Sequence, residues 1–256
     1  MRKIIAANWK MHKLRADAGQ TTEAIVQGLA ANHKPERDVF IFPPFLAIEA
    51  VGKVLATSKE KIVLGAQDFY PEDHGAFTGE VALPMIRDCG GTFVLVGHSE
   101  RRHILNESDA FLAEKTAYAL AHDFGVMLCI GETLEEREAG QLKDVLHRQL
   151  ASALTSDLLA KNPKEKLATD LIIAYEPVWA IGTGKVAGEK EVLEAHGLVK
   201  ELLANLSQDL SYLPVLYGGS VKPSNAASLL ALKNVDGLLV GGASLEAESF
   251  LQIINA

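Results

Sequence analysis

The chain has 256 residues and a formal net charge of −8, and its 48% hydrophobic and 23% charged residues are ordinary for a globular protein with a large core. This composition excludes a disordered or collagen-like chain, and the acidic balance without a long basic run argues against nucleic acid as a partner. The two cysteines, Cys89 and Cys129, are too few for a disulfide framework and fit a reducing compartment.

The N-terminal segment begins with charged residues and then has only a short apolar run, Ile4 to Ala7. A signal peptide needs roughly 7–15 apolar residues, and a membrane span needs about 20. We therefore expect a cytoplasmic protein without a membrane partner.

Short apolar or β-branched runs recur along the chain, and each is nearly continuous rather than alternating. They lie at Lys3–Ala7, Val39–Phe42, Lys61–Gly65, Thr92–Val96, Val126–Ile130, Leu171–Tyr175, Pro214–Tyr217 and Gly237–Val240. Continuous runs of this length are typical of strands that are buried on both faces, as in a parallel sheet.

Segments with helical spacing lie between these runs. The longest predicted helices are Ala110–Ala121, Gln141–Leu159 and Glu189–Leu206. Ser108 is expected to cap the first of them, and Leu193 is expected on the apolar side of the last. Two shorter helices are expected to open at Pro223 and Gly242.

A strand followed by a helix, repeated about eight times, predicts an α/β protein built as a single (β/α)8 barrel with eight parallel strands. No shift in composition marks a boundary, so we expect one domain over residues 1–256. The alternative is an open doubly wound sheet, which expects a glycine-rich turn after the first strand. The segment Ala7–Lys10 has no such glycines, and this favours the barrel.

In such a barrel the residues just after each strand line one face, where chemistry takes place. Glycine-rich turns follow the last two predicted strands, at Gly218–Ser220 and Gly241–Gly242. Backbone N–H groups in such turns can approach an anion closely, and a following helix adds partial positive charge. The plainer interpretation is a pair of tight turns, but both together at the last two strands favour a phosphate site.

Three further residues follow strands in the same way. His98 stands between a strand and the next helix, where a helix N-terminus disfavours an imidazolium and a neutral ring is expected. Glu176 ends a buried strand and precedes a loop that is unusually apolar unless it closes over something. Lys10 could be a surface charge, but its place just after the first strand favours the mouth of the barrel.

Several segments closely resemble the triosephosphate isomerase family and come in the family's order. They are Asn8–Met11, Phe77–Glu80, Val96–Arg102, Cys129–Glu132, Ala174–Gly184, Tyr217–Val221 and Val240–Leu245. The resemblance runs over nearly the whole chain. It implies a cofactor-free and metal-free enzyme that interconverts dihydroxyacetone phosphate and D-glyceraldehyde 3-phosphate through an enediol(ate), in glycolysis and gluconeogenesis.

The resemblance also implies a role for each matching residue. Glu176 resembles the catalytic base, His98 the neutral electrophile and Lys10 the lysine that favours the dianionic substrate. The implied substrate-binding residues are Asn8, Lys10, Gly182, Ser220, Gly241 and Gly242. Residues 177–185 resemble the family's closing lid.

A long loop, Gln67–Gly79, carries Phe69, Tyr70 and Phe77, which suits contact with the protein's own surface or with a partner. The resemblance implies a homodimer in which Thr78 reaches Asn8 and His98 of the partner subunit.

Two positions depart from the family's usual pattern: Asp68 replaces the usual asparagine, and His12 replaces an asparagine that often follows Lys-Met. We expect Asp68 to affect the details of the third loop and the pH dependence of assembly. We expect His12 to affect the electrostatics near Lys10.

Two rival functions stay open on the sequence. Another phosphate-binding barrel enzyme is one, although a Schiff-base aldolase would need a lysine where the sixth strand ends in Tyr175-Glu176. The other is a catalytically dead barrel that serves as a scaffold, which would have lost the base, the electrophile or the lid.

Overall fold

The computed structural model describes residues 2–32, 34, 36–181 and 187–256. Eight parallel strands form a closed barrel in sequence order, because β1 pairs with β2 on one side and with β8 on the other. The strands are β1 (Lys3–Asn8), β2 (Arg37–Phe42), β3 (Ile62–Ala66), β4 (Phe93–Val96), β5 (Gly125–Ile130), β6 (Leu171–Tyr175), β7 (Val215–Tyr217) and β8 (Gly237–Val240). The structure confirms the predicted barrel, and the alternative prediction of an open doubly wound sheet is wrong.

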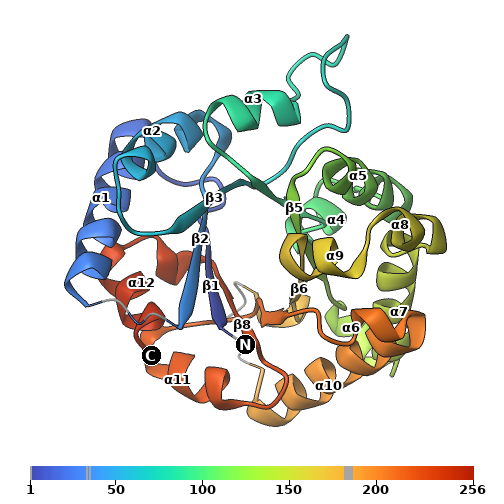
Figure 1. Ribbon diagram of the computed structural model, residues 1–256. Helices are drawn as coiled ribbons and strands as arrows, with labels where there is room; N and C mark the ends of the chain where they lie inside the picture. The colour runs from blue at the N-terminus through green and yellow to red at the C-terminus, as the bar shows by residue number, and fades with distance from the viewer. Residues whose placement is uncertain (1, 33, 35, 182–186) are drawn as a thin grey trace.

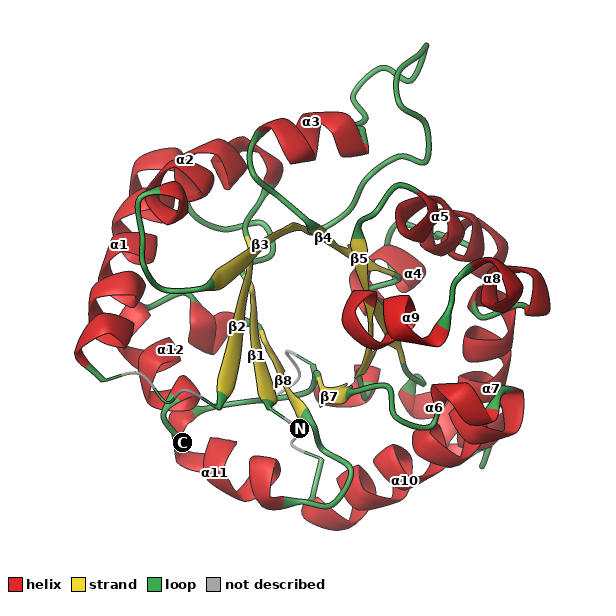
Figure 2. Ribbon diagram, viewed as in Figure 1, coloured by secondary structure: helices red, strands yellow, loops and turns green. Residues whose placement is uncertain are grey.

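A ring of helices surrounds the barrel (Figures 1 and 2). The α-helices of the described residues are α1 (Arg15–Ala31), α2 (Phe45–Ala56), α3 (Leu83–Asp88), α4 (Ser99–His103), α5 (Asp109–Ala121), α6 (Leu134–Glu138), α7 (Leu142–Ala153), α8 (Ser156–Lys161), α9 (Lys164–Asp170), α10 (Glu189–Leu206), α11 (Pro223–Ala231) and α12 (Ala247–Ile254). The described part of the chain also contains short 3-10 helices, η1 (Val178–Ala180), η2 (Gln208–Leu210) and η3 (Gly242–Ser244). Among the described residues, no helix is both long and apolar enough to cross a membrane.

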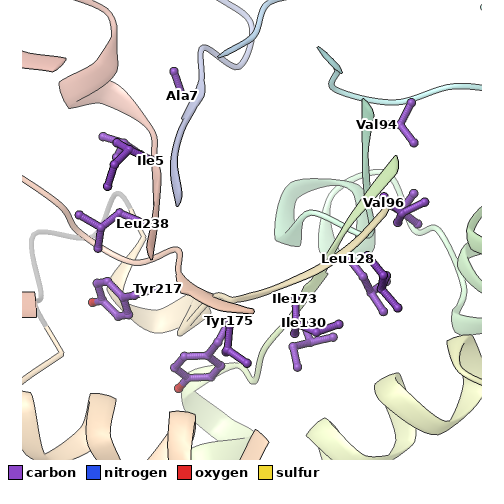
Figure 3. Packing of buried hydrophobic residues seen from close by; sticks show 14 of the residues in the cluster. Ile5, Ala7, Val94, Val96, Leu128, Ile130, Ile173, Tyr175, Tyr217 and Leu238 are labelled. Carbon is purple, nitrogen blue, oxygen red and sulfur yellow. The ribbon is translucent and has the colours of Figure 1, made fainter. Parts of the chain in front are cut away.

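The strands are buried on both faces, as their continuous apolar runs predict. Alternate residues such as Phe40, Leu95 and Met127 belong to a cluster inside the barrel. Their neighbours belong to a second cluster between strands and helices, and in Figure 3 residues such as Val96 and Tyr217 point from the strands toward the helices. Because side chains fill its interior, the barrel is a packed support for a site at its mouth rather than a pore.

Helix α10 begins and ends where the sequence predicts, and the Ser108 side chain caps α5 by accepting a hydrogen bond from the N–H of Phe111. The expectation that Leu193 lies on the apolar, core-facing side of α10 is wrong, because this side chain is 40% exposed.

The single helix predicted over Gln141–Leu159 is wrong. It divides into α7 and α8 because Leu154, with φ −102° and ψ 59°, leaves the helical conformation. The Thr155 hydroxyl then accepts a hydrogen bond from the N–H of Leu158 and starts a new helix. The helix expected to open at Gly242 is similarly divided, since η3 comes first and α12 begins only at Ala247.

A cluster of four buried or half-buried charges fixes the base of the loop between β3 and α3. Asp68 is 4% exposed and contacts the Lys115 ammonium and the Arg101 guanidinium, each at 2.7 Å. Glu107 contacts the same two cations. Burial raises the pKa of Asp68, although Lys115 acts against this. Asp68 is therefore built into an ion-pair network at the root of this loop.

His196 on α10 is fully buried between Tyr175 and Tyr217, the last residues of β6 and β7. Its Nδ1 lies 3.0 Å from the carbonyl oxygen of Asn234, which can only accept, so Nδ1 carries the proton. Burial lowers the pKa of His196 to about 4, against the opposing effect of this hydrogen bond. The imidazole is therefore neutral in the folded protein at neutral pH.

We predict that His196 weakens the fold in acid. An unfolded histidine binds its proton near pH 6.5 and the folded one only near pH 4, so stability falls as the pH drops between these values. Urea unfolding at fixed protein concentration, at pH 7 and pH 4.5, measures this loss. His196→Gln should lose roughly 2–3 kcal/mol less than the parent over that interval. Equal losses in both proteins would show that His196 does not titrate in this way.

Candidate active site

The carboxyl ends of the strands meet at one mouth of the barrel, around a cavity of about 410 Å³. A volume of this size suits a small ligand. The structure brings together the sequence-predicted residues Asn8, Lys10, His98, Glu176, Ser220, Gly241 and Gly242 in the lining of this cavity. The remaining one, Gly182, lies outside the described residues.

Glu176 follows β6 and is 2% exposed. Its Oε2 accepts a hydrogen bond of 2.8 Å from the N–H of Ser99, and its Oε1 lies 3.0 Å from His98 Nε2. Glycine at 218 makes room for this side chain, because a Cβ there would lie 2.9 Å from Glu176 Cγ. The carboxylate is thus fixed from the side of β4 and β7 inside a nearly dry pocket.

His98 is the N-cap residue of α4 and is 6% exposed. Its Nδ1 accepts a hydrogen bond of 3.2 Å from the N–H of Glu100. A ring nitrogen that accepts carries no proton, so this geometry assigns the neutral tautomer with the proton on Nε2. The Nε2–H of the His98 ring therefore faces Glu176. These hydrogen bonds agree with the neutral ring expected from the sequence.

Lys10 adopts a left-handed backbone with φ 51°, which is strained for a residue with a side chain. Side chains hold both of its peptide groups: its N–H donates to Asn8 Oδ1 at 3.0 Å, and its carbonyl accepts from Gln67 Nε2 at 2.8 Å. This conformation brings the ammonium into the cavity lining, where it donates to Glu100 Oε1 at 2.8 Å. Burial alone would raise the pKa of Glu100, but the hydrogen bond from Lys10 holds that pKa below its ordinary value.

The turns after β7 and β8 also line the cavity, and Gly241 leads directly into η3, which begins at Gly242. The first N–H groups of a helix have no partner within it and favour an anion. A Cβ at Gly242 would meet nothing within 4 Å, so this glycine borders open space in the cavity. Lys222, an exposed residue, also lines the cavity.

A net charge of −8 repels an anionic ligand as a whole, so an anion site in this protein needs local positive charge. Lys10, Lys222 and the N–H groups of η3 supply local positive potential for an anionic ligand in the same cavity that Glu176 and His98 line. No group of metal-binding side chains occurs among the described residues. Cys129, next to the site, is fully buried, and burial together with the charge of Glu176 raises the pKa of its thiol well above the ordinary value.

The segment after Glu176 is tied to Glu132, which is fully buried at the end of β5. Glu132 Oε1 accepts hydrogen bonds from the Tyr175 hydroxyl at 3.0 Å and from Trp179 Nε1 at 2.9 Å. Arg137 lies 3.1 Å from the same oxygen. Of the lid expected at residues 177–185, residues 177–181 are described and begin from this anchor, and residues 182–185 lie outside the described residues.

From the sequence we assign no role to Lys222, which lines the cavity, or to Glu100 and Glu132, which contact residues of the site and of the segment after it. Glu132 had a usable signal, since it follows a buried strand just as Glu176 does. Glu100 had none, because its contact with Lys10 joins residues 90 positions apart.

Comparisons with known proteins agree with this geometry. The family model described as triosephosphate isomerase matches residues 3–256. The triosephosphate isomerase of Nitratidesulfovibrio vulgaris (strain DP4) is 52% identical over 100% of both chains. That of Lawsonia intracellularis is 49% identical over 100% of this chain and 98% of the relative. The crystal structure of triosephosphate isomerase from Bartonella henselae superposes with a TM-score of 0.86 at 36% identity, covering 100% of this chain and 98% of the other.

Proposed function

The chain belongs to the triosephosphate isomerase family, and we propose that Glu176, His98 and Lys10 carry out the family's reaction in it. The protein interconverts dihydroxyacetone phosphate and D-glyceraldehyde 3-phosphate through an enediol(ate), an aldose–ketose isomerisation of glycolysis and gluconeogenesis. The observation that carries the residue roles is the Glu176 carboxylate within hydrogen-bonding distance of His98 Nε2 and of the Ser99 N–H, in the cavity of about 410 Å³.

Glu176 is proposed as the base. It removes a proton from C1 of dihydroxyacetone phosphate, and the electron pair of that C–H bond forms the C1–C2 double bond of the enediolate. The C1 hydroxyl then gives up its proton and the C2 oxygen takes one, while the carboxylic acid of Glu176 returns its proton to C2. C1 becomes the aldehyde carbon and C2 carries the hydroxyl group. A carboxylate that is 2% exposed is poorly solvated, and this strengthens its interaction with any positive or acidic group next to it.

His98 is proposed as the electrophile that stabilises the developing oxyanion. Its Nε2–H donates to Glu176 Oε1 at 3.0 Å, and this distance leaves no room for a substrate atom between them. When substrate binds, the His98 Nε2–H must therefore exchange its hydrogen-bond acceptor, from Glu176 Oε1 to the oxygens on C1 and C2. The same exchange frees one carboxylate oxygen to act as the base.

Lys10 is proposed to bind the dianionic substrate, together with Asn8, Ser220, Gly241 and Gly242; Gly182, named for the same role, lies outside the described residues. Gly241 lies beside the Lys10 side chain, since a Cβ at Gly241 would lie 3.4 Å from Lys10 Cε, and both residues line the same cavity as Glu176. This arrangement suits a substrate whose phosphate binds near Lys10 and η3 while its reacting carbons meet Glu176. Binding energy from the phosphate can then position C1 and C2 between base and electrophile.

We also infer a homodimer and a single catalytic domain over residues 1–256. The loop between β3 and α3 projects from the barrel (Figure 1) and carries Phe77, which is 38% exposed. A separate cleft of about 760 Å³ is lined by Met11 and Leu46, which are 94% and 85% exposed. An exposed arm and an exposed apolar cleft on one chain suit a two-fold pair in which each arm fills the partner's cleft. Thr78 on that arm would then reach Asn8 and His98 of the partner subunit.

A cytoplasmic location is inferred from the glycolytic reaction and from the two free cysteines, Cys89 and Cys129. The rival functions have less support: β6 ends without the lysine of a Schiff-base aldolase, and a scaffold would not need the paired Glu176 and His98.

Glu176→Asp should keep the fold and lower kcat by on the order of 100-fold, because withdrawing the carboxylate by roughly 1 Å misplaces the base. The assay couples dihydroxyacetone phosphate formation from glyceraldehyde 3-phosphate to NADH loss through glycerol-phosphate dehydrogenase. Glu176→Gln, purified in parallel, should be nearly silent. Parental turnover in either variant would remove Glu176 from the base role.

His98→Gln should lower kcat far more than it changes KM, because stabilisation of the enediolate is needed only in the transition state. The same coupled assay gives both constants. A change confined to KM would make His98 a binding residue instead.

Leu46→Glu should weaken the dimer, since it places a charge in the apolar cleft proposed for the partner's loop. Sedimentation velocity at nanomolar to micromolar concentrations should show a dimer for the parent and a larger monomer fraction for the variant. Leu193→Glu is the matched control, because Leu193 is an exposed leucine on α10 outside the cleft. An active parental monomer would contradict the proposed assembly.

A further inference from the structure

The pairing between β4 and β5 ends just before the residues of the active site. The last pair in register is Val96 with Leu128, so Gly97 and Cys129 would form the next one. Gly97 has φ +75°, a left-handed conformation that turns the chain out of the sheet. The strand ends that carry His98 and support Glu176 therefore separate at this point.

The Arg102 side chain from α4 bridges the separated strand ends. Its Nε donates to the carbonyl oxygen of Gly97 at 2.8 Å, and its terminal NH2 donates to the carbonyl oxygen of Cys129 at 3.0 Å. Nε is also 3.3 Å from the Cys129 oxygen. These are the carbonyls of the two residues that would make the next pair of the ladder, and the bridging side chain is only 7% exposed.

The guanidinium also fills the space beside the turn. A Cβ at Gly97 would lie 2.8 Å from the Arg102 NH2 nitrogen, so the guanidinium packs directly on the glycine. Its remaining nitrogen, NH1, contacts Asp109 Oδ1 on α5 at 2.6 Å. Asp109 Oδ2 in turn contacts Arg148 Nε at 3.0 Å. Arg102 is thus anchored to α5 directly through Asp109, whereas the exposed Arg148 contacts only the other oxygen of that carboxylate.

His98 and Glu176 are both positioned by residues next to the two carbonyls that Arg102 bridges. On β4, Gly97 is followed by His98 and by Ser99, whose N–H binds Glu176 Oε2. On β5, Cys129 is followed by Ile130, whose carbonyl accepts the backbone N–H of Glu176 at 2.7 Å. The distance between the imidazole and the carboxylate therefore depends on how the ends of β4 and β5 are held together.

The geometry points to Arg102 as a positioning residue, whose guanidinium replaces the missing rung between β4 and β5 and sets where His98 Nε2 faces Glu176. It touches no substrate and acts through His98, so the inference rests on the proposed role of that residue. Lysine cannot take its place, because an ammonium is a point donor without the planar fork that reaches two carbonyls and a carboxylate together.

Arg102→Lys should lower kcat by at least about tenfold and leave KM within about threefold, because a small misplacement of the electrophile mainly affects the transition state. Arg148→Ala is the matched control: it removes an exposed arginine from the other side of Asp109 and should keep the parental kcat. A folded Arg102→Lys protein with parental kcat would overturn the inference.

Two further measurements separate this inference from the role of His98. In the His98→Gln background, Arg102→Lys should change kcat by less than about twofold, because a positioning residue has nothing left to position. An equal loss in both backgrounds would show that Arg102 does not act through His98. The His98 Nε2–H proton resonance should shift or broaden in Arg102→Lys. An unmoved signal would also overturn the positioning role, whatever the activity of His98→Gln.

If Arg102→Lys did not fold, Asp109→Asn would be the second variant. It weakens the contact to NH1 and leaves both carbonyl contacts of Arg102 available. It should produce a smaller fall in kcat with KM little changed, and a parental kcat would contradict the inference.

Discussion

The active site depends above all on the closure of eight strands that run in the same direction. In a closed parallel barrel every strand ends at the same mouth. Residues that follow different strands therefore become neighbours, however far apart they are in the sequence. Lys10, His98, Glu176 and Gly241 follow four different strands and line one cavity for this reason. Closure of the barrel fixes only the approximate positions of these residues, however. Contacts with side chains outside the strands determine the exact positions of their reactive groups.

Those side chains place polar groups where the backbone alone would not. Asn8 and Gln67 hold Lys10 in a left-handed conformation, and Gly218 gives Glu176 room beside β7. Glu132 collects the donors of Tyr175 and Trp179 at a single buried oxygen. The site therefore consists of a few reactive groups and a larger set of residues that constrain them, as precise catalytic geometry requires.

The sequence predicts the fold well because the apolar runs of a two-faced parallel sheet are continuous; β6 and β8 begin and end at the predicted residues. It fails at Leu154, where an amphipathic pattern continues across a break that Thr155 caps. Residues that directly follow strands, such as His98 and Glu176, are predictable from position. Contacts such as Lys10 with Glu100 are not, because they depend on strand tilt and side-chain rotamers that no local pattern encodes.

The glycines around Glu176 have a consequence for attempts to change substrate size by directed evolution. A Cβ at Gly131 would lie 1.7 Å from the Glu176 carbonyl oxygen, and one at Gly219 would lie 2.2 Å from the Tyr217 hydroxyl. A library that varied these positions would consist mainly of misfolded or inactive members. Gly242 is different, because a Cβ there meets nothing within 4 Å. The residues around the cavity thus differ in how freely they can be substituted, and a search for altered substrate size is best begun at Gly242.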